Sequence, residues 1–377
     1  MTDYFDIISF ILLLGIGQGV FLAAILIHKR ENRFVNIFLA ALMLLLSIDL
    51  SYYFLTTIGI HPSQNVLGVV YVGNSLLFAP LYYLYVRSLT KPGRGFHINT
   101  LAHFIPFAIY KTYIVFLTFF RHIDLWNPIY FFDINNSPIQ FDLYNQVVNV
   151  QMIAYIIACT VLLRRYHKEI KDRFSTLEHL QLRWLVFFTS IIFTLWLVAF
   201  IVRLILIWHT SLYIESIIAI GIAVLIYALG YRGLLQREVF FWDATVTSPQ
   251  KYERSGLDNK HVASLLARLR LLMEQEQPYE KNDLVHSELA SMLDIPPYQL
   301  SQLLNEHLNR NFYDFVNGYR IERAKLLLKD PEYRKRTILA IAYESGFNSK
   351  SSFNTAFKKH TRMTPSQYLT SQRVNNK

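Results

Sequence analysis

Cysteine and charged residues are scarce in this sequence. Among its 377 residues there is one cysteine, Cys159, so no disulfide framework and no cysteine-ligated metal cluster can form within one chain. Asp, Glu, Lys and Arg together make up 17% of the residues, where a soluble domain has about a quarter. The shortage is concentrated in residues 1–230, which consist of long apolar stretches, whereas residues 250–377 have the composition of an ordinary soluble domain.

The residue patterns of common enzymes are also missing. The apolar half contains no HExxH motif, no paired carboxylates and no nucleophile constellation. Four histidines of this half, His28, His103, His122 and His209, are scattered over both expected sides of a membrane, which argues against a metal site. We therefore expect a protein that is not an enzyme and that binds no metal and no cofactor.

The N-terminus lacks the features of a cleaved signal peptide. It begins Met1-Thr-Asp-Tyr-Phe-Asp, which is acidic where a signal peptide carries Lys or Arg. The apolar run that follows is also longer than the hydrophobic region of a signal peptide. We expect this run to be a transmembrane helix.

Seven apolar stretches are long enough to cross a membrane. A bilayer core of about 30 Å needs roughly 20 apolar residues in a helix, because unpaired backbone groups are not tolerated in hydrocarbon. The stretches are 5–27, 34–56, 66–86, 101–120, 147–163, 184–208 and 212–230. The sequence therefore predicts an all-α fold, with a seven-helix membrane bundle before the soluble domain.

The distribution of Lys and Arg predicts the orientation of this bundle. The loops after the first, third and fifth stretches hold twelve of them: Lys29, Arg30, Arg33, Arg87, Lys91, Arg94, Arg164, Arg165, Lys168, Lys171, Arg173 and Arg183. The opposite side holds one, Arg121, beside Asp124, Asp133 and Asp142. Because basic loops stay in the cytoplasm, we expect a multi-pass protein of the bacterial inner membrane with its N-terminus outside and its C-terminus inside.

Four ionisable residues lie within the predicted spans, namely Asp49, Lys111, Arg203 and Glu215. Charges at membrane depth are costly, so they pair with one another or line a polar cavity. Three interpretations stay open: a structural ion-pair cluster, a ligand pocket open to the outside, and a path for an ion or proton.

The chain changes character after Gly230. Residues 231–260 are expected to form a cytoplasmic tether, and residues 261–377 a soluble helical domain. Val262, Leu265, Leu266, Leu269 and Leu272 recur at the three- and four-residue spacing of a packed helix. From Arg320 to Lys377 there are 13 Lys and Arg against 4 Asp and Glu, and such a basic excess indicates a polyanionic partner.

Two similar short-helix, turn, helix units follow, at about 284–308 and 337–360. In the first, Pro297 opens the second helix, where a missing N–H costs nothing, and the expected core residues are Leu289, Ala290, Leu293, Ile295, Leu300 and Leu303. In the second, Thr337 and Ser349 are expected N-caps, and Gly346 supplies a helix-ending positive φ. Phe347, Phe353 and Phe357 are expected in its core.

One long helix is expected between the two units, over residues 312–328. At 1.5 Å per residue it spans about 25 Å, a rigid spacer suited to placing two recognition helices about one DNA turn apart.

The second unit and the segment before it resemble a known family. The residues are Ile338-Leu-Ala-Ile-Ala-Tyr-Glu-Ser-Gly-Phe-Asn-Ser-Lys-Ser-Ser-Phe-Asn-Thr-Ala-Phe-Lys-Lys, then Thr364-Pro-Ser-Gln-Tyr, and upstream Asn317-Gly-Tyr-Arg-Ile-Glu-Arg-Ala-Lys-Leu-Leu-Leu. Over residues 280–370 the chain resembles the AraC/XylS family of bacterial transcription regulators. The resemblance implies two helix-turn-helix units that read adjacent major grooves of double-stranded DNA. The N-terminal half looks like the seven-span variant of the family and not like its usual cupin-like sensor.

The resemblance also implies which side chains meet DNA. The first recognition helix would present Tyr298, Ser301, Gln302 and Asn305, and the second Lys350, Ser351, Asn354 and Thr355. Gln and Asn pair with adenine edges and Lys with guanine. Many family members carry Arg in the first helix, whereas this chain has none between Pro296 and His307. Arg320, Lys358, Lys359 and Arg362 are interpreted as phosphate contacts or surface charges.

Several functions remain open at this point. The sequence favours a one-component receptor, in which the membrane bundle senses a signal and the tethered domain regulates transcription. The alternatives are a passively anchored DNA-binding protein, a transporter or membrane enzyme with a regulatory tail, and a basic tail that binds lipid headgroups. The expected partners are double-stranded DNA and the lipid bilayer, with an unidentified small ligand and a second copy of the chain as further candidates.

Overall fold

The computed structural model describes residues 2–30, 32–60, 68–91, 98–120, 139–177, 180, 182–205, 212–235, 259–330, 332–333 and 336–375. Every element in these ranges is a helix, apart from an isolated antiparallel bridge between Phe174 and Val285. The chain divides into two compact units, 1–164 with 182–242 and 165–181 with 243–377. We describe each unit by itself.

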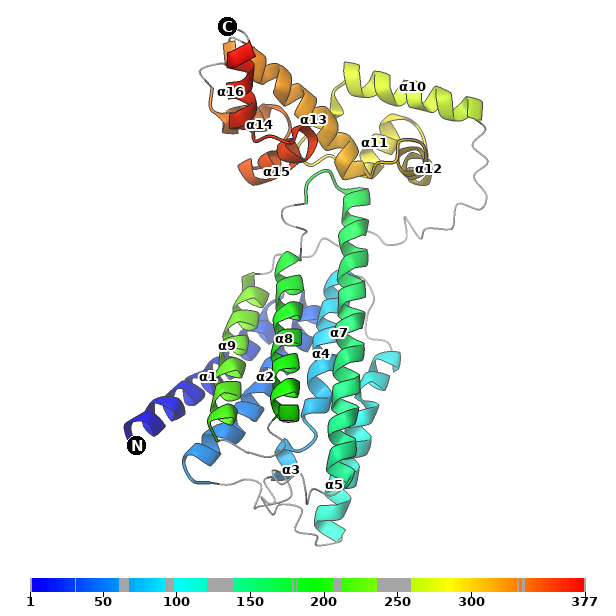
Figure 1. Cartoon of the computed structure of the whole chain (residues 1–377). Coiled ribbons are helices and arrows are strands. Elements are labelled where there is room, and N and C mark those ends of the chain that lie inside the picture. Colours follow the sequence, from blue (N-terminus) through cyan, green and yellow to red (C-terminus); the bar gives the residue numbers. More distant parts are fainter. Residues whose placement is uncertain are drawn as a thin grey trace. The chain divides into compact units, whose positions relative to one another are not determined.

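The N-terminal unit consists of long apolar helices (Figure 1): α1 Thr2–His28, α2 Arg33–Thr57, α3 Gly68–Tyr71, α4 Ser75–Thr90, α5 Ile105–Phe120, α7 Ile139–Arg173, α8 Arg183–Ile205 and α9 Leu212–Leu235. A 3-10 turn, Ile98–Phe104, precedes α5. Each of the seven predicted spans contains a helix, and the third is divided at Gly73, whose φ is +90°. The last residues of α7 belong to the C-terminal unit.

Four helical runs in the described residues are long and apolar enough to cross a membrane. They are Ile7–His28, Arg33–Thr57, Gly68–Thr90 and Leu143–Arg173. The apolar runs in α8 and α9, Arg183–Val198 and Ile220–Leu235, are shorter. The all-helical fold is thus confirmed, whereas the count of seven membrane spans stays a prediction.

Helix packing in the N-terminal unit depends on close approach at glycine. Helix α1 packs against α2 and α9, and α2 also packs against α4. A Cβ on Gly19 would overlap the hydroxyl of Ser47, and one on Gly230 would overlap Leu22. Small residues at such crossings allow the helix backbones to approach closely.

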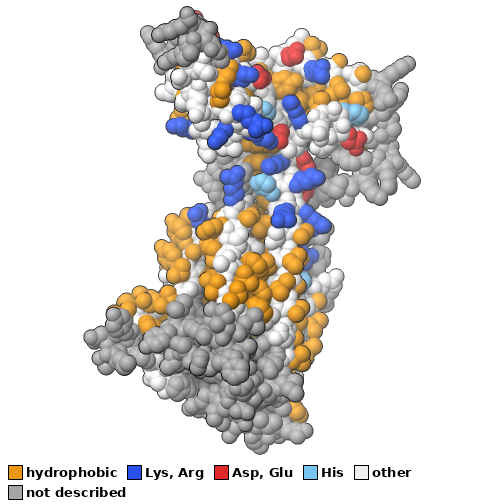
Figure 2. Space-filling model, in the orientation of Figure 1, with side chains coloured by type: hydrophobic (Ala, Val, Ile, Leu, Met, Phe, Trp, Pro, Cys, Tyr) orange, Lys and Arg blue, Asp and Glu red, His pale blue; other side chains and the backbone are white. Residues whose placement is uncertain are grey.

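The outside of this unit carries many large apolar side chains. Leu26, Leu39 and Met43 are buried between helices, whereas Phe21 and Val150 are exposed. Hydrophobic side chains cover much of the part of this surface that Figure 2 draws in colour. A helix that is apolar on all sides requires an apolar surrounding.

The C-terminal unit contains shorter helices (Figure 1): α10 Asn259–Gln275, α11 His286–Met292, α12 Pro297–Gln302, α13 Phe312–Lys329, α14 Ile338–Glu344, α15 Lys350–Thr361 and α16 Pro365–Asn375. A 3-10 turn, Pro278–Glu280, precedes α11, and a π-helical turn, Leu303–His307, extends α12. The long helix expected over 312–328 is therefore present as α13.

Two hydrophobic cores organise this unit, and α13 contributes to both. The first core contains the predicted stripe of α10 and the buried leucines of α11 and α12, together with Phe312, Phe315 and Val316. The second contains Ile321, Ala324, Leu327 and Leu328 together with residues of α14 and α15. Phe347, Phe353 and Phe357 lie in this second core, as predicted.

The predicted helix ends are confirmed. The Thr337 side chain accepts a hydrogen bond from the Ala340 amide at 3.1 Å, and the Ser349 side chain accepts one from the Ser352 amide at 3.2 Å. Gly346 has φ +85°, and a Cβ there would overlap the Tyr279 carbonyl oxygen. Both the turn and this close approach require glycine.

Candidate nucleic-acid interface

The first recognition helix is α12 with its π-helical continuation. Asp294 has φ +54° in the turn before it, and Pro296 is in the extended conformation that precedes the helix. Leu300 and Leu303 are buried in the first core. Among the four predicted contact residues, the side chains of Tyr298 and Asn305 are exposed.

The other two predicted contact residues already have hydrogen-bond partners. The Ser301 hydroxyl lies 3.1 Å from Nε2 of His286. Gln302 is buried, and its amide donates to Oε2 of Glu306 at 2.9 Å. This bond uses one of the two amide N–H donors of Gln302, so a base contact would have to use the other N–H and the amide oxygen or displace Glu306, and it stays a prediction.

Burial gives His286 an unusual titration. Its ring packs edge-on against Phe312, with ring centroids 5.4 Å apart. Burial lowers the pKa of His286 to about 4, and the positive charge of Arg173 adds to the shift. The imidazole is therefore neutral at physiological pH and supports the helix-turn-helix core beneath Ser301.

The second recognition helix is α15. Phe353, Ala356 and Phe357 form its buried face. The opposite face exposes small polar and basic side chains: Lys350, Ser351, Thr355 and Lys358 are exposed, and Asn354 is half-buried. This surface has the size and polarity to enter a major groove and form hydrogen bonds with base edges.

Lys359 connects α15 to the linker helix. Its Nζ lies 2.6 Å from Oδ1 of Asp314 on α13, although its side chain is more than half exposed. An exposed ion pair of this kind stabilises by at most about 1 kcal/mol. Lys359 can therefore turn toward a phosphate at little cost.

Arg320 is not a phosphate contact, and our interpretation of it was wrong. Its side chain is 0% exposed and lies between the two cores, on α13. Its Nε donates to the Tyr279 carbonyl at 2.7 Å, and its Nη2 donates to the Lys281 carbonyl at 2.7 Å. Arg320 contributes to the basic excess of the sequence, but its charged group forms hydrogen bonds in the protein interior.

The predicted intramembrane cluster is only partly within the described residues. Oδ1 of Asp49 accepts a hydrogen bond from Asn74 at 3.4 Å. The Lys111 ammonium donates to the carbonyls of Val69 at 2.5 Å and Val72 at 2.9 Å, so it caps the end of α3. In the described residues the contacts of Asp49 and Lys111 are these hydrogen bonds and not an ion pair with one another, and the side chains of Arg203 and Glu215 lie outside the described residues.

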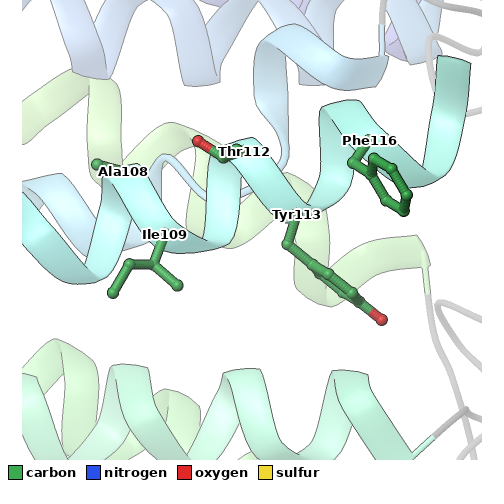
Figure 3. A pocket seen from close by; sticks show the side chains of 5 residues that line it. All are labelled: Ala108, Ile109, Thr112, Tyr113 and Phe116. Atoms are coloured by element: carbon green, nitrogen blue, oxygen red, sulfur yellow. The ribbon is translucent and has the colours of Figure 1, made fainter. Parts of the chain in front are cut away.

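A shallow apolar hollow on α5 does not provide a ligand pocket. Ala108, Ile109, Thr112, Tyr113 and Phe116 line it, and all five project from the same helix (Figure 3). A surface contributed by one helix cannot surround a ligand. The part of the chain that the structure describes also holds no group of His, Cys, Asp and Glu side chains that would bind a metal ion.

The C-terminal unit is similar in sequence to known proteins. A helix-turn-helix domain family matches residues 289–371. An uncharacterized HTH-type transcriptional regulator of Staphylococcus aureus (strain COL) is 42% identical over 86 residues, which are 23% of this chain and 11% of that protein. The HTH-type transcriptional regulator GlxA of Rhizobium meliloti (strain 1021) is 29% identical over 131 residues, 34% of this chain and 39% of that protein.

The sequence similarity covers only part of each relative. The chain spans about a tenth of the Staphylococcus aureus relatives and about two fifths of the Rhizobium meliloti relative. No solved structure matches the chain. The C-terminal region is therefore an AraC-type helix-turn-helix domain, similar to those of transcriptional regulators.

Proposed function

We propose that this protein is a transcription regulator of the bacterial inner membrane, in which the N-terminal helices cross the bilayer and the helix-turn-helix domain binds DNA in the cytoplasm. The observation that carries the proposal is the match of a helix-turn-helix family to residues 289–371. Two recognition helices, α12 with Pro297 at its start and α15 capped by Ser349, are joined through the linker helix α13, and such a pair of helices is what binding to two half-sites needs.

The four long apolar helices support the membrane part of the proposal. Their exposed faces carry large apolar side chains such as Phe10, Phe21 and Val150. Water would disfavour so much exposed apolar surface, whereas lipid accommodates it. The Lys and Arg bias of the loops supports a cytoplasmic location for the C-terminal unit.

Sensing is the finer part of the proposal. The N-terminal unit has more helices than anchoring requires, and it keeps Asp49 and Lys111 within apolar helices. Intramembrane ionisable residues are costly and so are commonly functional. We propose that a signal received by these helices changes how the helix-turn-helix domain binds DNA.

DNA binding by the full chain in lipid nanodiscs tests the proposal. Several phosphate contacts release counterions, so the affinity for duplex DNA should fall steeply with salt, by about 10³-fold or more between 50 and 200 mM for six or more contacts. Promoter fragments protected by the protein should contain two half-sites. Affinity that does not change with salt would contradict the proposal.

Membrane insertion is tested separately. Carbonate extraction of cell membranes should leave the full chain in the bilayer, and a truncated chain lacking residues 1–230 should be released. A full chain that is extracted would leave DNA binding possible but would contradict the membrane assignment.

A further inference from the structure

A short segment that follows α7 packs into the helix-turn-helix unit. The segment is Phe174–Leu177, and by its packing it belongs to the same compact unit as residues 243–377. Phe174 forms an antiparallel bridge with Val285, one residue before α11. Ser175 is 1% exposed. A segment from the N-terminal half of the sequence is thus part of the interior of the DNA-binding unit.

Ser175 contacts both parts of that unit. Its hydroxyl donates to the Leu284 carbonyl at 2.7 Å, and its amide donates to the same oxygen at 3.3 Å. Its carbonyl accepts from Nη1 of Arg320 at 3.2 Å and from Nδ2 of Asn317 at 3.3 Å. The residue therefore joins the segment that leads into α11 to the linker helix α13.

Losing the contact with Ser175 is unfavourable because Arg320 is buried and depends on its hydrogen-bond partners. Its five N–H donors all have partners: Tyr279, Lys281 and Asn282 carbonyls, the Asn317 side chain, and both oxygens of Ser175. No salt bridge to Arg320 occurs in the described residues. When Ser175 leaves, a buried guanidinium loses two partners, and buried charged donors without partners are strongly unfavourable.

We propose that Phe174–Leu177 is an internal docking segment that couples the N-terminal helices to DNA binding. When it is docked on Arg320, Asn317 and Leu284, it holds the first helix-turn-helix unit against α13. When it is released, the two recognition helices lose their fixed spacing and the affinity for a two-half-site DNA falls. The proposal rests on the proposed function, because it assumes that the helix-turn-helix domain binds DNA.

The position of this segment in the chain suits it to couple the N-terminal helices to the helix-turn-helix domain. Helix α7 runs without interruption from Ile139 to Arg173, and the docking segment follows it at once. Leu182 and α8 then return to the N-terminal unit. A shift or rotation of α7 therefore reaches Ser175 along the chain, because the helix ends at Arg173, two residues before it. Coupling between two sites requires an element with two discrete states, and here these are the docked and the released states of the segment.

The first experiment measures docking without DNA. Hydrogen exchange is followed in the full chain in nanodiscs for wild type, Ser175→Ala and the control Ser190→Ala. Ser190 is exposed on α8, and its hydroxyl bonds only to its own helix, at the Val186 carbonyl. Ser175→Ala should speed exchange of amides in 282–286 and 317–321 by roughly tenfold or more, whereas Ser190→Ala should leave them unchanged.

The second experiment locks the docked state. Residues that face one another in an antiparallel bridge have Cα atoms about 4.5–5.5 Å apart, within the range of a disulfide. The double variant Phe174→Cys with Val285→Cys, in a Cys159→Ser background, should therefore crosslink on oxidation. The oxidised protein should bind two-half-site DNA at least as tightly as wild type, and Ser175→Ala should bind it roughly tenfold more weakly.

The outcomes separate this proposal from the proposed function. Unchanged exchange in Ser175→Ala together with failure of the cysteine pair to crosslink would overturn docking. Faster exchange with unchanged DNA affinity would overturn coupling while leaving docking in place. Normal docking in a full chain that binds no duplex DNA would overturn the proposed function instead.

Discussion

The guanidinium of Arg320 donates hydrogen bonds to both the carbonyl and the hydroxyl oxygen of Ser175, at 3.2 Å each, across a separation of 145 residues. Arg320 lies on the linker helix, and Ser175 follows the long helix α7. The stability of the DNA-binding unit consequently depends on a residue far outside residues 289–371.

Arg320→Met should destabilise the C-terminal unit by about 3 kcal/mol or more, because the buried carbonyls of Tyr279 and Lys281 lose their donors. Urea unfolding of the full chain, followed by the proteolytic susceptibility of residues 259–375, measures this loss. Arg323→Met is the matched control, since Arg323 is partly exposed and only pairs with Glu280 at 3.5 Å. Equal loss in both variants would contradict the role of Arg320.

Gly346→Ala should destabilise the same unit by about 2 kcal/mol or more. The residue has φ +85°, and an added Cβ would overlap the Tyr279 carbonyl. Gly318→Ala is expected to have the opposite effect, because Gly318 lies within α13 and an added Cβ meets its neighbours at 3.6 Å. Thermal unfolding of the two variants compares them, and a loss in Gly318→Ala alone would refute the argument.

Lowering the pH should reduce the stability of the C-terminal unit because His286 becomes protonated. Its pKa is lowered to about 4 in the folded protein, whereas an unfolded histidine titrates near 6.5. Between these values the unfolded chain binds more protons, so stability falls as the pH falls, by about 2 kcal/mol at pH 5 relative to pH 7. His286→Gln should remove this part of the pH dependence of unfolding. A variant whose stability falls as steeply as that of wild type between pH 7 and 5 would show that other groups are responsible.

Asn354→Ala and Gln302→Ala should each weaken binding to a specific site by about 1–3 kcal/mol while leaving binding to random DNA nearly unchanged. Lys359→Ala should weaken both kinds of binding and lower the slope of log affinity against log salt by about 1. Titrations with specific and random duplexes at several salt concentrations distinguish these effects. Identical behaviour of all three variants would mean that the base-reading residues are assigned wrongly. Since Gln302 donates to Glu306, Glu306→Ala is a useful companion: it should free the amide without lowering affinity.

Reporter fusions test the predicted topology. A reporter active only in the cytoplasm should work when fused after Arg94 or Lys377 and should fail after Pro62 or Asn136, because the Lys and Arg bias places these positions on opposite sides. An external reporter should give the reverse pattern. A single inverted position would require a different number of spans.

The sequence predicts the helix-turn-helix unit well because its signals are local. The caps at Thr337 and Ser349, the positive φ of Gly346 and the leucine stripe of α10 each depend on residues a few positions apart. The Phe353 and Phe357 side chains likewise follow from helical periodicity.

The roles of Arg320 and Ser175 could not be predicted in this way. An arginine in a basic helix suggests a phosphate contact, and only the fold shows that it is buried among carbonyls. Ser175 follows a run of basic residues that suggests no more than a cytoplasmic loop. Gln302 also differs from expectation, because the position on the recognition helix says nothing of its bond to Glu306. Contacts distant in sequence leave no periodic signal.

The sharing of α13 between the two hydrophobic cores has a consequence for how the domain loses its structure. Phe315 and Val316 are buried in one core and Ile321 and Ala324 in the other. Unfolding of either half disturbs α13, which the core of the other half needs. The two halves should therefore unfold in a single cooperative transition. Loosening one of the two helix-turn-helix units should therefore loosen the other as well. A contact made to α13 itself, such as that of Ser175 with Asn317 and Arg320, therefore acts on both halves at once.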